Sequence, residues 1–438
     1  MRPAEAAPTV RRMGLPRAAR GPVAALLAAG LALLPVLAGV PSASAGAPAT
    51  GSAARPTADR SAPTPTAPRT GRPPQGSAPD GRTVGGEDLD TRGLVVADDA
   101  PPLPGPLAAS GWLVADASSG TVLAARDPHG RYYPASTLKA LTLLTLAPRL
   151  DPAQVVVGTP EDEQVEGSRV GLLAGGSYTV GFLFQALILQ SGNDAANALA
   201  RAAGGTEATV DAMTETAESI GAYDTVVGGP SGLDVAGQSS SPYDLALIFR
   251  DLVADPATAA VLTTRVAQVP EVPGRAPGFQ IQNQNPLAAY PGTLGGKTGF
   301  TDAARHAFVT AAERDGRRLV VSVLDTENQP LRAADQAALL LDWGFAVPAG
   351  TEGVGRLVQP ADLLAPPEPT RSAPRPDEPA PPVAADRPGD DASPLVGAGL
   401  AVAAVVVVGV TVVGRRRAVR WVPAPDRAPG RGVSEEDR

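Results

Sequence analysis

The chain has only two lysines, and their rarity makes them the first candidates for chemistry. Lys and Arg together number 37 among the 438 residues, and the two lysines are Lys139 and Lys297. An Arg side chain stays protonated in proteins, whereas a buried Lys can lose its proton and act as a base. These two positions are therefore the ones best suited to a proton-transfer role.

The first lysine ends the string Ser136-Thr137-Leu138-Lys139, at the start of a helix that we expect over 136–145. Residues three apart share a helix face, so the hydroxyl and the amine can meet. A neutral Lys can then take the Ser proton and make the hydroxyl a nucleophile. The N–H groups at a helix N-terminus favour a neutral amine and can bind an oxyanion. S-x-x-K alone is common on surface helices, but the leucines that follow indicate a buried one.

A second string, Ser191-Gly192-Asn193, falls between two expected helices. A hydroxyl and a carboxamide in a tight turn can relay a proton and hold a substrate amide. The alternative is an ordinary helix cap, with Asn193 or Asp194 as the N-cap residue. The string alone does not separate the two interpretations.

The second lysine lies in Gly295-Gly296-Lys297-Thr298-Gly299-Phe300. Small residues around a strand let a ligand approach the backbone, and Lys297 with Thr298 offers a cation and a hydroxyl for a carboxylate. A phosphate loop would need glycine five residues before Gly296, where Pro291 stands, and no helix is expected to follow. The phosphate interpretation is therefore excluded.

The elements that must position these strings are expected within residues 101–350. We expect a strand pair at 111–117 and 121–126, and a second pair at 307–312 and 318–324 around the hairpin turn Asp315-Gly316. Helices are expected over 136–145, 179–190 with Thr179 as cap, 194–203, 206–220, 242–254 and 331–344. This order predicts an α+β fold: one antiparallel sheet flanked by terminal helices, with a helical insertion.

The residues on either side of 101–350 resemble segments for export, linkers and a membrane attachment. Residues 1–45 resemble a signal peptide, with an arginine-rich start, an apolar run and the site Ala43-Ser44-Ala45; a retained anchor is the alternative. Residues 46–100 and 351–394 are rich in Pro and Ala and are expected to be a disordered linker and a Pro-rich linker. Residues 395–414 carry no charge and match one membrane span, with a buried helix as the alternative. The arginines after them predict a cytoplasmic tail at 415–438 and an extracellular catalytic domain.

Composition narrows the classes of function. The chain has no Cys and only two histidines, His129 and His306, so we expect no thiol chemistry, no metal site and no cofactor. A net charge of −8 argues against a nucleic-acid partner.

The three strings occur in the order S-x-x-K, S-G-N, K-T-G, and both lysines fall inside them. The sequence therefore resembles the active-site serine penicillin-recognising enzymes of the beta-lactamase and transpeptidase-like fold. Within that group it resembles most the low-molecular-mass D-alanyl-D-alanine carboxypeptidases, over residues 105–347. The matching strings are Tyr133 to Lys139, Ser191 to Ala196, Gly229 to Asp234 and Lys297 to Thr301.

The resemblance implies a role for each residue of the strings. Ser136 would be the nucleophile that forms an acyl-enzyme with a peptidoglycan stem peptide, and Lys139 its general base. Ser191 would relay a proton to the leaving D-alanine, and Asn193 would hold the substrate amide and Lys139. Lys297 and Thr298 would bind the terminal carboxylate. The N–H groups of Ser136 and Phe300 would form the oxyanion hole, and beta-lactams would acylate Ser136 as inhibitors.

Two other interpretations stay open. A class A-like beta-lactamase would need a deacylating glutamate in an E-x-x-L-N-like string after the second motif, and the glutamates there show none: Glu207, Glu215, Glu218 and Glu271. A catalytically inactive peptidoglycan-binding module would use the cleft for docking alone. The chain also has Ala303-Ala304-Arg305-His306 where relatives often carry Gly, and we expect His306 to flank a strand.

Overall fold

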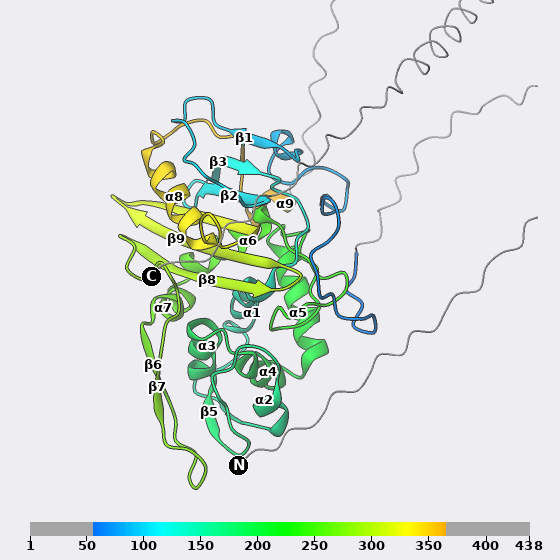
Figure 1. The fold of residues 1–438 in the computed structure, drawn as a ribbon, viewed down its shortest axis with the longest axis vertical. Coiled ribbons are helices and arrows are strands. Elements are labelled where there is room, and N and C mark those ends of the chain that lie inside the picture. The colour runs from blue at the N-terminus through cyan, green and yellow to red at the C-terminus, as the bar shows by residue number, and fades with distance from the viewer. Residues whose placement is uncertain (1–55, 365–438) are drawn as a thin grey trace, which may run out of the picture. The chain divides into compact units, whose positions relative to one another are not determined.

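An antiparallel sheet of seven strands organises the structure (Figure 1). The computed structural model describes residues 56–364; the expected signal peptide, membrane span and cytoplasmic tail lie outside them. The strand order is β1-β3-β2-β10-β9-β8, with β11 paired to β3. The strands are β1 (Leu94–Val96), β2 (Gly111–Asp116), β3 (Thr121–Arg126), β8 (Thr293–Thr301), β9 (Arg305–Arg314), β10 (Arg317–Thr326) and β11 (Gly355–Arg356).

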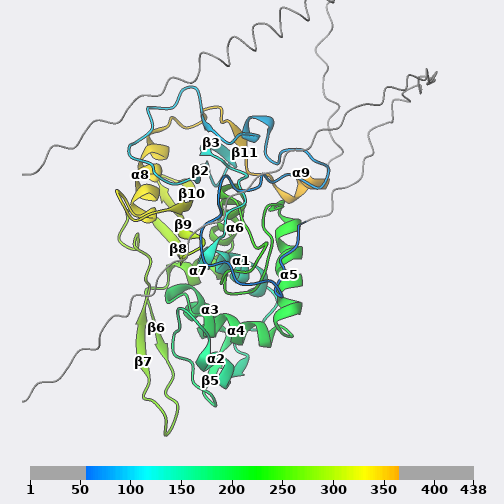
Figure 2. The same cartoon turned by 45° about the vertical axis from the view of Figure 1, so that its right-hand side comes forward.

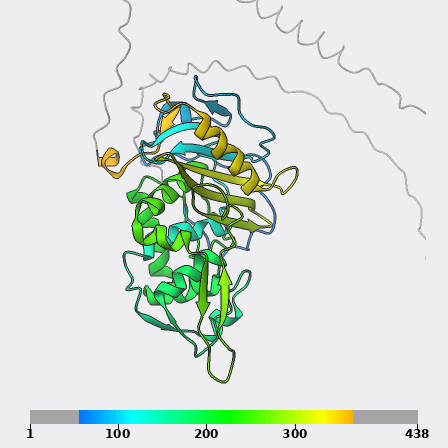
Figure 3. The same ribbon diagram turned by 90° about the vertical axis from the view of Figure 1, so that its left-hand side faces the viewer.

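Helices cover both faces of this sheet. Figure 3 shows α8 lying across one face, and α6 packs against β2, β9 and β10 from the other. The helices are η1 (Glu87–Leu89), η2 (Ala135–Leu138), α1 (Lys139–Leu146), α2 (Pro160–Gln164), α3 (Val180–Leu189), α4 (Asn193–Ala202), α5 (Thr206–Ser219), α6 (Pro242–Ala254), α7 (Pro256–Thr263), α8 (Ala333–Ala346) and α9 (Pro360–Leu364). Two small ribbons, β4 (Val155–Val157) with β5 (Ser177–Thr179) and β6 (Val266–Val269) with β7 (Phe279–Gln282), complete the described elements.

The alternation of side chains along the central strands explains both layers. In β2, Trp112 and Val114 belong to the cluster beneath α8, whereas Leu113 and Ala115 belong to the larger cluster on the other face. Because both faces are covered, the strand reads as a continuous apolar run. The turn that joins β9 to β10 has positive φ at Asp315 and Gly316, as the hairpin prediction requires. The predicted α+β class, with helices inserted between β3 and β8, is confirmed.

Two predictions about the ends of this domain are wrong. The expected linker 46–100 contains η1 and β1, and the expected Pro-rich linker 351–394 contains β11 and α9. Of the terminal helices expected to flank the sheet, the carboxy-terminal one is present as α8, whereas the described residues before β2 hold only the 3-10 turn η1 and the short strand β1. Within residues 56–364, no helix has both the length and the apolar character needed to cross a membrane.

Residues 56–93, here called the arm, are fastened to the domain by backbone groups as well as by side chains such as the buried Leu89. Asp59 N–H donates to Ala236 O (2.7 Å), Gly76 N–H to His129 O (2.9 Å), and Arg131 N–H to Pro74 O (2.9 Å). The first described residues of the arm lie beside α5 (Figure 2). Composition cannot reveal such contacts, because any residue type offers a backbone N–H and C=O.

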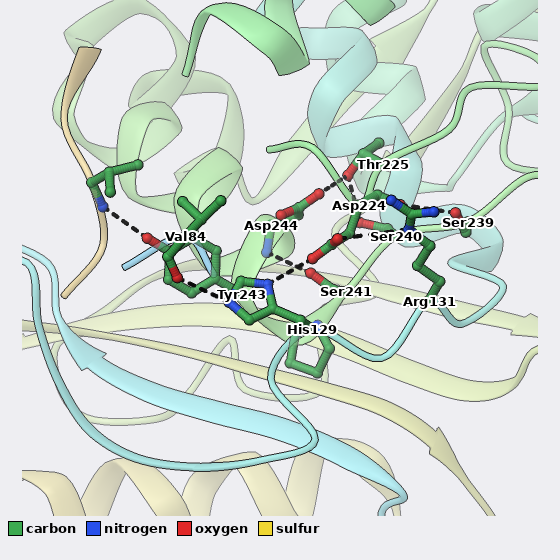
Figure 4. A network of polar contacts seen from close by, with 12 residues as sticks. Val84, His129, Arg131, Asp224, Thr225, Ser239, Ser240, Ser241, Tyr243 and Asp244 are labelled. Carbon is green, nitrogen blue, oxygen red and sulfur yellow. Dashed lines mark hydrogen bonds and ion pairs between the residues drawn. The ribbon is translucent and has the colours of Figure 1, made fainter. Parts of the chain in front are cut away.

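A buried histidine ties the far end of the arm to the domain (Figure 4). Nδ1 of His129 lies 2.8 Å from Asp224 Oδ2, and Nε2 lies 3.0 Å from Val84 O in the arm. The Asp224 carboxylate and the Val84 carbonyl oxygen both accept hydrogen bonds. Both ring nitrogens of His129 must therefore donate, so the ring is a protonated imidazolium. Burial lowers the pKa of His129, but the hydrogen bond and charge of Asp224 outweigh it and raise that pKa.

Candidate active site

The nucleophile candidate lies on a tight turn between the sheet and the first long helix. Instead of one helix over 136–145, the chain forms the 3-10 turn η2 and then α1, which begins at Lys139. In a 3-10 turn residues three apart lie almost in line, which places Lys139 Nζ 3.0 Å from Ser136 Oγ. The preceding Ala135 has a positive φ of 47°, a strained conformation for a residue with a side chain. The predicted meeting of Ser136 and Lys139 is thus present.

The contacts of Lys139 select the direction of proton transfer. Its side chain is fully buried, and Nζ donates to Asn193 Oδ1 (2.7 Å) and to the backbone oxygen of Ser231 (2.5 Å). Burial, and then the charge of Lys297, hold the pKa of Lys139 well below its usual range, although Asp194 opposes them. A neutral amine has two N–H donors and one lone pair. When Lys139 is neutral, the two acceptors take both of its N–H groups, and the lone pair faces the Ser136 hydroxyl.

The second serine is paired with the second lysine. Lys297 Nζ donates to Ser191 Oγ (3.0 Å) and to the backbone oxygen of Thr298 (2.7 Å). Ser191 has a positive φ of 56° in the turn before α4, and Asn193 is the first residue of that helix. Burial lowers the pKa of Lys297 to about 7. The hydroxyl of Ser191 therefore joins the second string to the third, which contains Lys297.

The backbone of β8 lies against the turn that carries Ser136. A side chain on Gly299 would meet Ala135 Cβ and Pro134 O at 3.0 Å and Ser136 N at 3.1 Å. Glycine is required there because the two backbones lie so close together. Phe300, the next residue, is 51 % exposed, and Thr298 is half-buried.

His306 lies opposite Phe300 across β8 and β9, with the two ring centres 4.4 Å apart. The prediction that it flanks a strand is confirmed, since it is the second residue of β9. Burial lowers the pKa of His306. Its place beside Phe300 puts its ring next to the expected oxyanion donor.

The structure thus joins five of the predicted residues in two hydrogen-bonded groups: Ser136, Lys139 and Asn193, and Ser191 with Lys297. Thr298 and Phe300 follow on the same strand as Lys297. Sequence reasoning assigned no role to Ser231, whose backbone oxygen binds Lys139, and offered the buried Asp194 only as a helix cap, a position that Gly192 takes. A backbone oxygen that accepts a hydrogen bond cannot be predicted from the residue type. The only signal for Ser231 in the sequence is that it lies in Gly229 to Asp234, one of the strings that match the family. Among residues 56–364 no cluster of acidic or histidine side chains could hold a metal ion.

A serine hydroxyl beside a buried lysine, with a second hydrogen-bonded pair of serine and lysine, is the arrangement of an active-site serine hydrolase of the S-x-x-K type. The comparisons with known proteins agree with that class. Residues 97–328 match the model of the D-alanyl-D-alanine carboxypeptidase family, peptidase family S11. The chain therefore belongs to this family of serine peptidases.

Individual relatives are similar over the same region. D-alanyl-D-alanine carboxypeptidase DacB2 of Mycobacterium tuberculosis is 46 % identical over 266 residues, which cover 59 % of this chain and 88 % of that protein. A crystal structure of a D-alanyl-D-alanine carboxypeptidase from the same organism is 42 % identical, with a TM-score of 0.57, and covers 60 % of this chain and all of that one. The Streptomyces K15 DD-transpeptidase is 25 % identical, with a TM-score of 0.53, over 56 % of this chain and all of that one.

Proposed function

We propose that the protein is a serine-type D-Ala-D-Ala carboxypeptidase, which removes the terminal D-alanine of peptidoglycan stem peptides in cell-wall maturation. The observation that carries this proposal is the contact set of Lys139, which leaves the lone pair of a neutral amine for the Ser136 hydroxyl. Family membership supplies the class of reaction. No cofactor is required for this chemistry.

In the first half of the reaction, Ser136 Oγ attacks the carbonyl carbon of the penultimate D-alanine while its proton moves to Lys139 Nζ. The N–H groups of Ser136 and Phe300 bind the oxyanion of the tetrahedral intermediate. The C–N bond then breaks. The leaving amine of D-alanine takes up a proton, relayed from Lys139 through the Ser191 hydroxyl.

In the second half, water attacks the acyl ester of Ser136. Lys139 takes a proton from the water and delivers it to Ser136 Oγ as the ester C–O bond breaks, which releases the shortened peptide and restores the Ser136 hydroxyl. Until D-alanine leaves, Lys297 and Thr298 hold the terminal carboxylate of the substrate, and Asn193 holds a substrate amide. A beta-lactam places a similar carbonyl and carboxylate in the same groups, so we propose that it acylates Ser136 as an inhibitor.

The test is conversion of a stem pentapeptide to the tetrapeptide, followed by mass spectrometry, with beta-lactam hydrolysis measured in parallel. Release of D-alanine with slow drug hydrolysis supports the carboxypeptidase. Rapid drug hydrolysis without D-alanine release would favour the beta-lactamase alternative. Neither reaction, with peptidoglycan still bound, would favour the inactive binding module. An added amino acceptor measures any transpeptidation.

We further propose that the catalytic domain works outside the cell and is held by a single membrane span at 395–414. Support comes from the signal-like residues 1–45 and from the arginines that follow the uncharged run. A chain truncated after residue 364 should be released into the medium, whereas the full chain should sediment with membranes. Equal release of both would contradict this attachment.

A further inference from the structure

We propose that Asp194 is a positioning residue for the reaction: it holds residues 166–172, here called the clamp loop, against Asn193, and the clamp loop turns the Asn193 carboxamide toward Lys139. This inference rests on the proposed function, since it concerns the base that activates Ser136. It gives a role to the buried Asp194 carboxylate and to the clamp loop, neither of which takes part in the mechanism above.

The carboxylate of Asp194 is fully buried and accepts four backbone N–H bonds. Oδ1 accepts from Val170 (3.1 Å) and from Ala195 (2.9 Å), and Oδ2 accepts from Gly171 (2.8 Å) and Leu172 (3.0 Å). Its position in the first turn of α4 adds the favourable field of that helix N-terminus. Because a buried carboxylate is stable only when its acceptors are filled, Asp194 fixes the end of the clamp loop.

The other end of the clamp loop fixes Asn193. Asn193 Nδ2 donates to Glu166 O (2.7 Å), and Asn193 N–H donates to Ser168 O (2.8 Å). A carboxamide carries its N–H₂ and its oxygen on opposite branches. When Glu166 O takes Nδ2, the oxygen Oδ1 must face the other way, where Lys139 Nζ lies at 2.7 Å.

A flipped Asn193 would present N–H₂ to Lys139. One of the two acceptors of the neutral amine would then be lost, and its lone pair would no longer be reserved for Ser136. The chain from Asp194 through the clamp loop to Asn193 therefore controls the direction of the hydrogen bond between Ser136 and Lys139.

Two glycines allow a test that leaves every one of these polar side chains in place. Gly167 and Gly175 both have positive φ, 78° and 83°, so an alanine at either position has a similar backbone cost. A methyl group on Gly167 would lie 2.8 Å from Asn193 Nδ2, whereas one on Gly175 would meet no atom within 4 Å. G175A is therefore the matched control for G167A.

The experiment measures the rate at which benzylpenicillin acylates the full-length protein. We expect G167A to slow acylation about 10- to 100-fold, the usual loss when a reacting group is misplaced by about 1 Å, and G175A to stay within about twofold of the wild type. Equal rates for the two variants, whether both high or both low, would overturn the inference. If the wild type is neither acylated nor active on peptide, the proposed function itself fails.

Asp194→Asn gives a second measurement, with Asp162→Asn as its control. Asp162 is as buried as Asp194 but accepts from Thr159 N–H and Arg201, not from the clamp loop. Burial and Lys297 lower the pKa of Lys139 and Asp194 raises it, so losing the Asp194 charge should move the acidic limb of acylation to lower pH. Losing its bonds to the clamp loop should also slow acylation. Asp162→Asn should leave the limb in place. Loss of stability alone, without a shift of the limb, would contradict the positioning role.

Discussion

Replacement of His129 by Ala tests how the arm is held. The variant removes an imidazolium whose two N–H groups bind Asp224 and Val84, and it leaves the Asp224 carboxylate buried, with the Arg131 guanidinium 3.6 Å away. Removal of one partner of a buried ion pair costs about 3–5 kcal/mol. The ring also packs on Tyr243, with ring centres 4.7 Å apart, so the packing loss adds to the same effect.

This loss of unfolding free energy corresponds to a decrease in the melting temperature, Tm. Unfolding entropy is about 2.1 cal/mol/K per residue, or about 0.6 kcal/mol/K for the roughly 300 residues of the described domain, so His129→Ala should lower Tm by about 5–8 °C at pH 6. Differential scanning calorimetry of the full chain measures it. The matched control is His306→Ala, because His306 is only half-buried, and it should shift Tm by less than about 2 °C.

The dependence of the Tm difference on pH tests whether the His129 ring is charged. The pKa of His129 is raised in the folded state above its ordinary value of 6.5, so its stabilisation is complete below about pH 6.5 and is lost as pH rises through the folded pKa. The Tm difference between wild type and His129→Ala should therefore be largest near pH 6 and narrow in alkali. Burial and Asp224 raise the pKa of Asp244 to about 8, so the destabilisation from this group builds up between about pH 4 and 8 and is constant above pH 8. A Tm loss below about 2 °C at pH 6, or a difference that widens with pH, would refute the imidazolium assignment.

Three further predictions concern the site and the domain boundary. Because the pKa of Lys297 is about 7, kcat/KM for a peptide with a free terminal carboxylate should fall about tenfold per pH unit above 7, as the protonated fraction does, and an amidated peptide should lack this limb. Lys297→Ala should remove the same limb; an unchanged profile would count against the carboxylate role. Gly299→Ala should slow acylation about 100-fold, since its methyl meets the turn of Ser136, whereas Gly229→Ala has nothing within 4 Å and should not; equal rates would contradict the close approach. A 101–350 fragment should melt well below a 56–364 fragment, because it lacks the arm, β11 and α9; equal melting would make the arm dispensable.

Residue type and spacing were sufficient to predict most of the helices and the contact between Ser136 and Lys139. Thr179 caps α3 through its hydroxyl, which accepts from Phe182 N–H, as a Thr before an apolar helix predicts. The meeting of Ser136 with Lys139 follows from their spacing on a helical turn, whether that turn is 3-10 or α. These features are local, so the sequence near them determines them.

Features built from backbone atoms of distant segments could not be predicted. The arm has no apolar periodicity, and its attachment depends on carbonyl and N–H groups such as those of Pro74 and Gly76. The contact of Ser231 with Lys139 could not be predicted either, because it uses the backbone oxygen of Ser231 and not its side chain. Asp194 did stand in a recognised string, but its role depends on a loop 22–24 residues earlier in the chain.

The account depends most on Ser136 as the nucleophile and Lys139 as its base. The direct measurement is peptide mass spectrometry and the rate of adduct formation after mixing the protein with benzylpenicillin. The account predicts an adduct on the peptide that contains Ser136, no adduct in Ser136→Ala, and a rate lower by about 10²- to 10⁴-fold in Lys139→Arg, since Arg keeps the charge but cannot take the proton. An adduct on another residue, or an undiminished rate in Lys139→Arg, would contradict it.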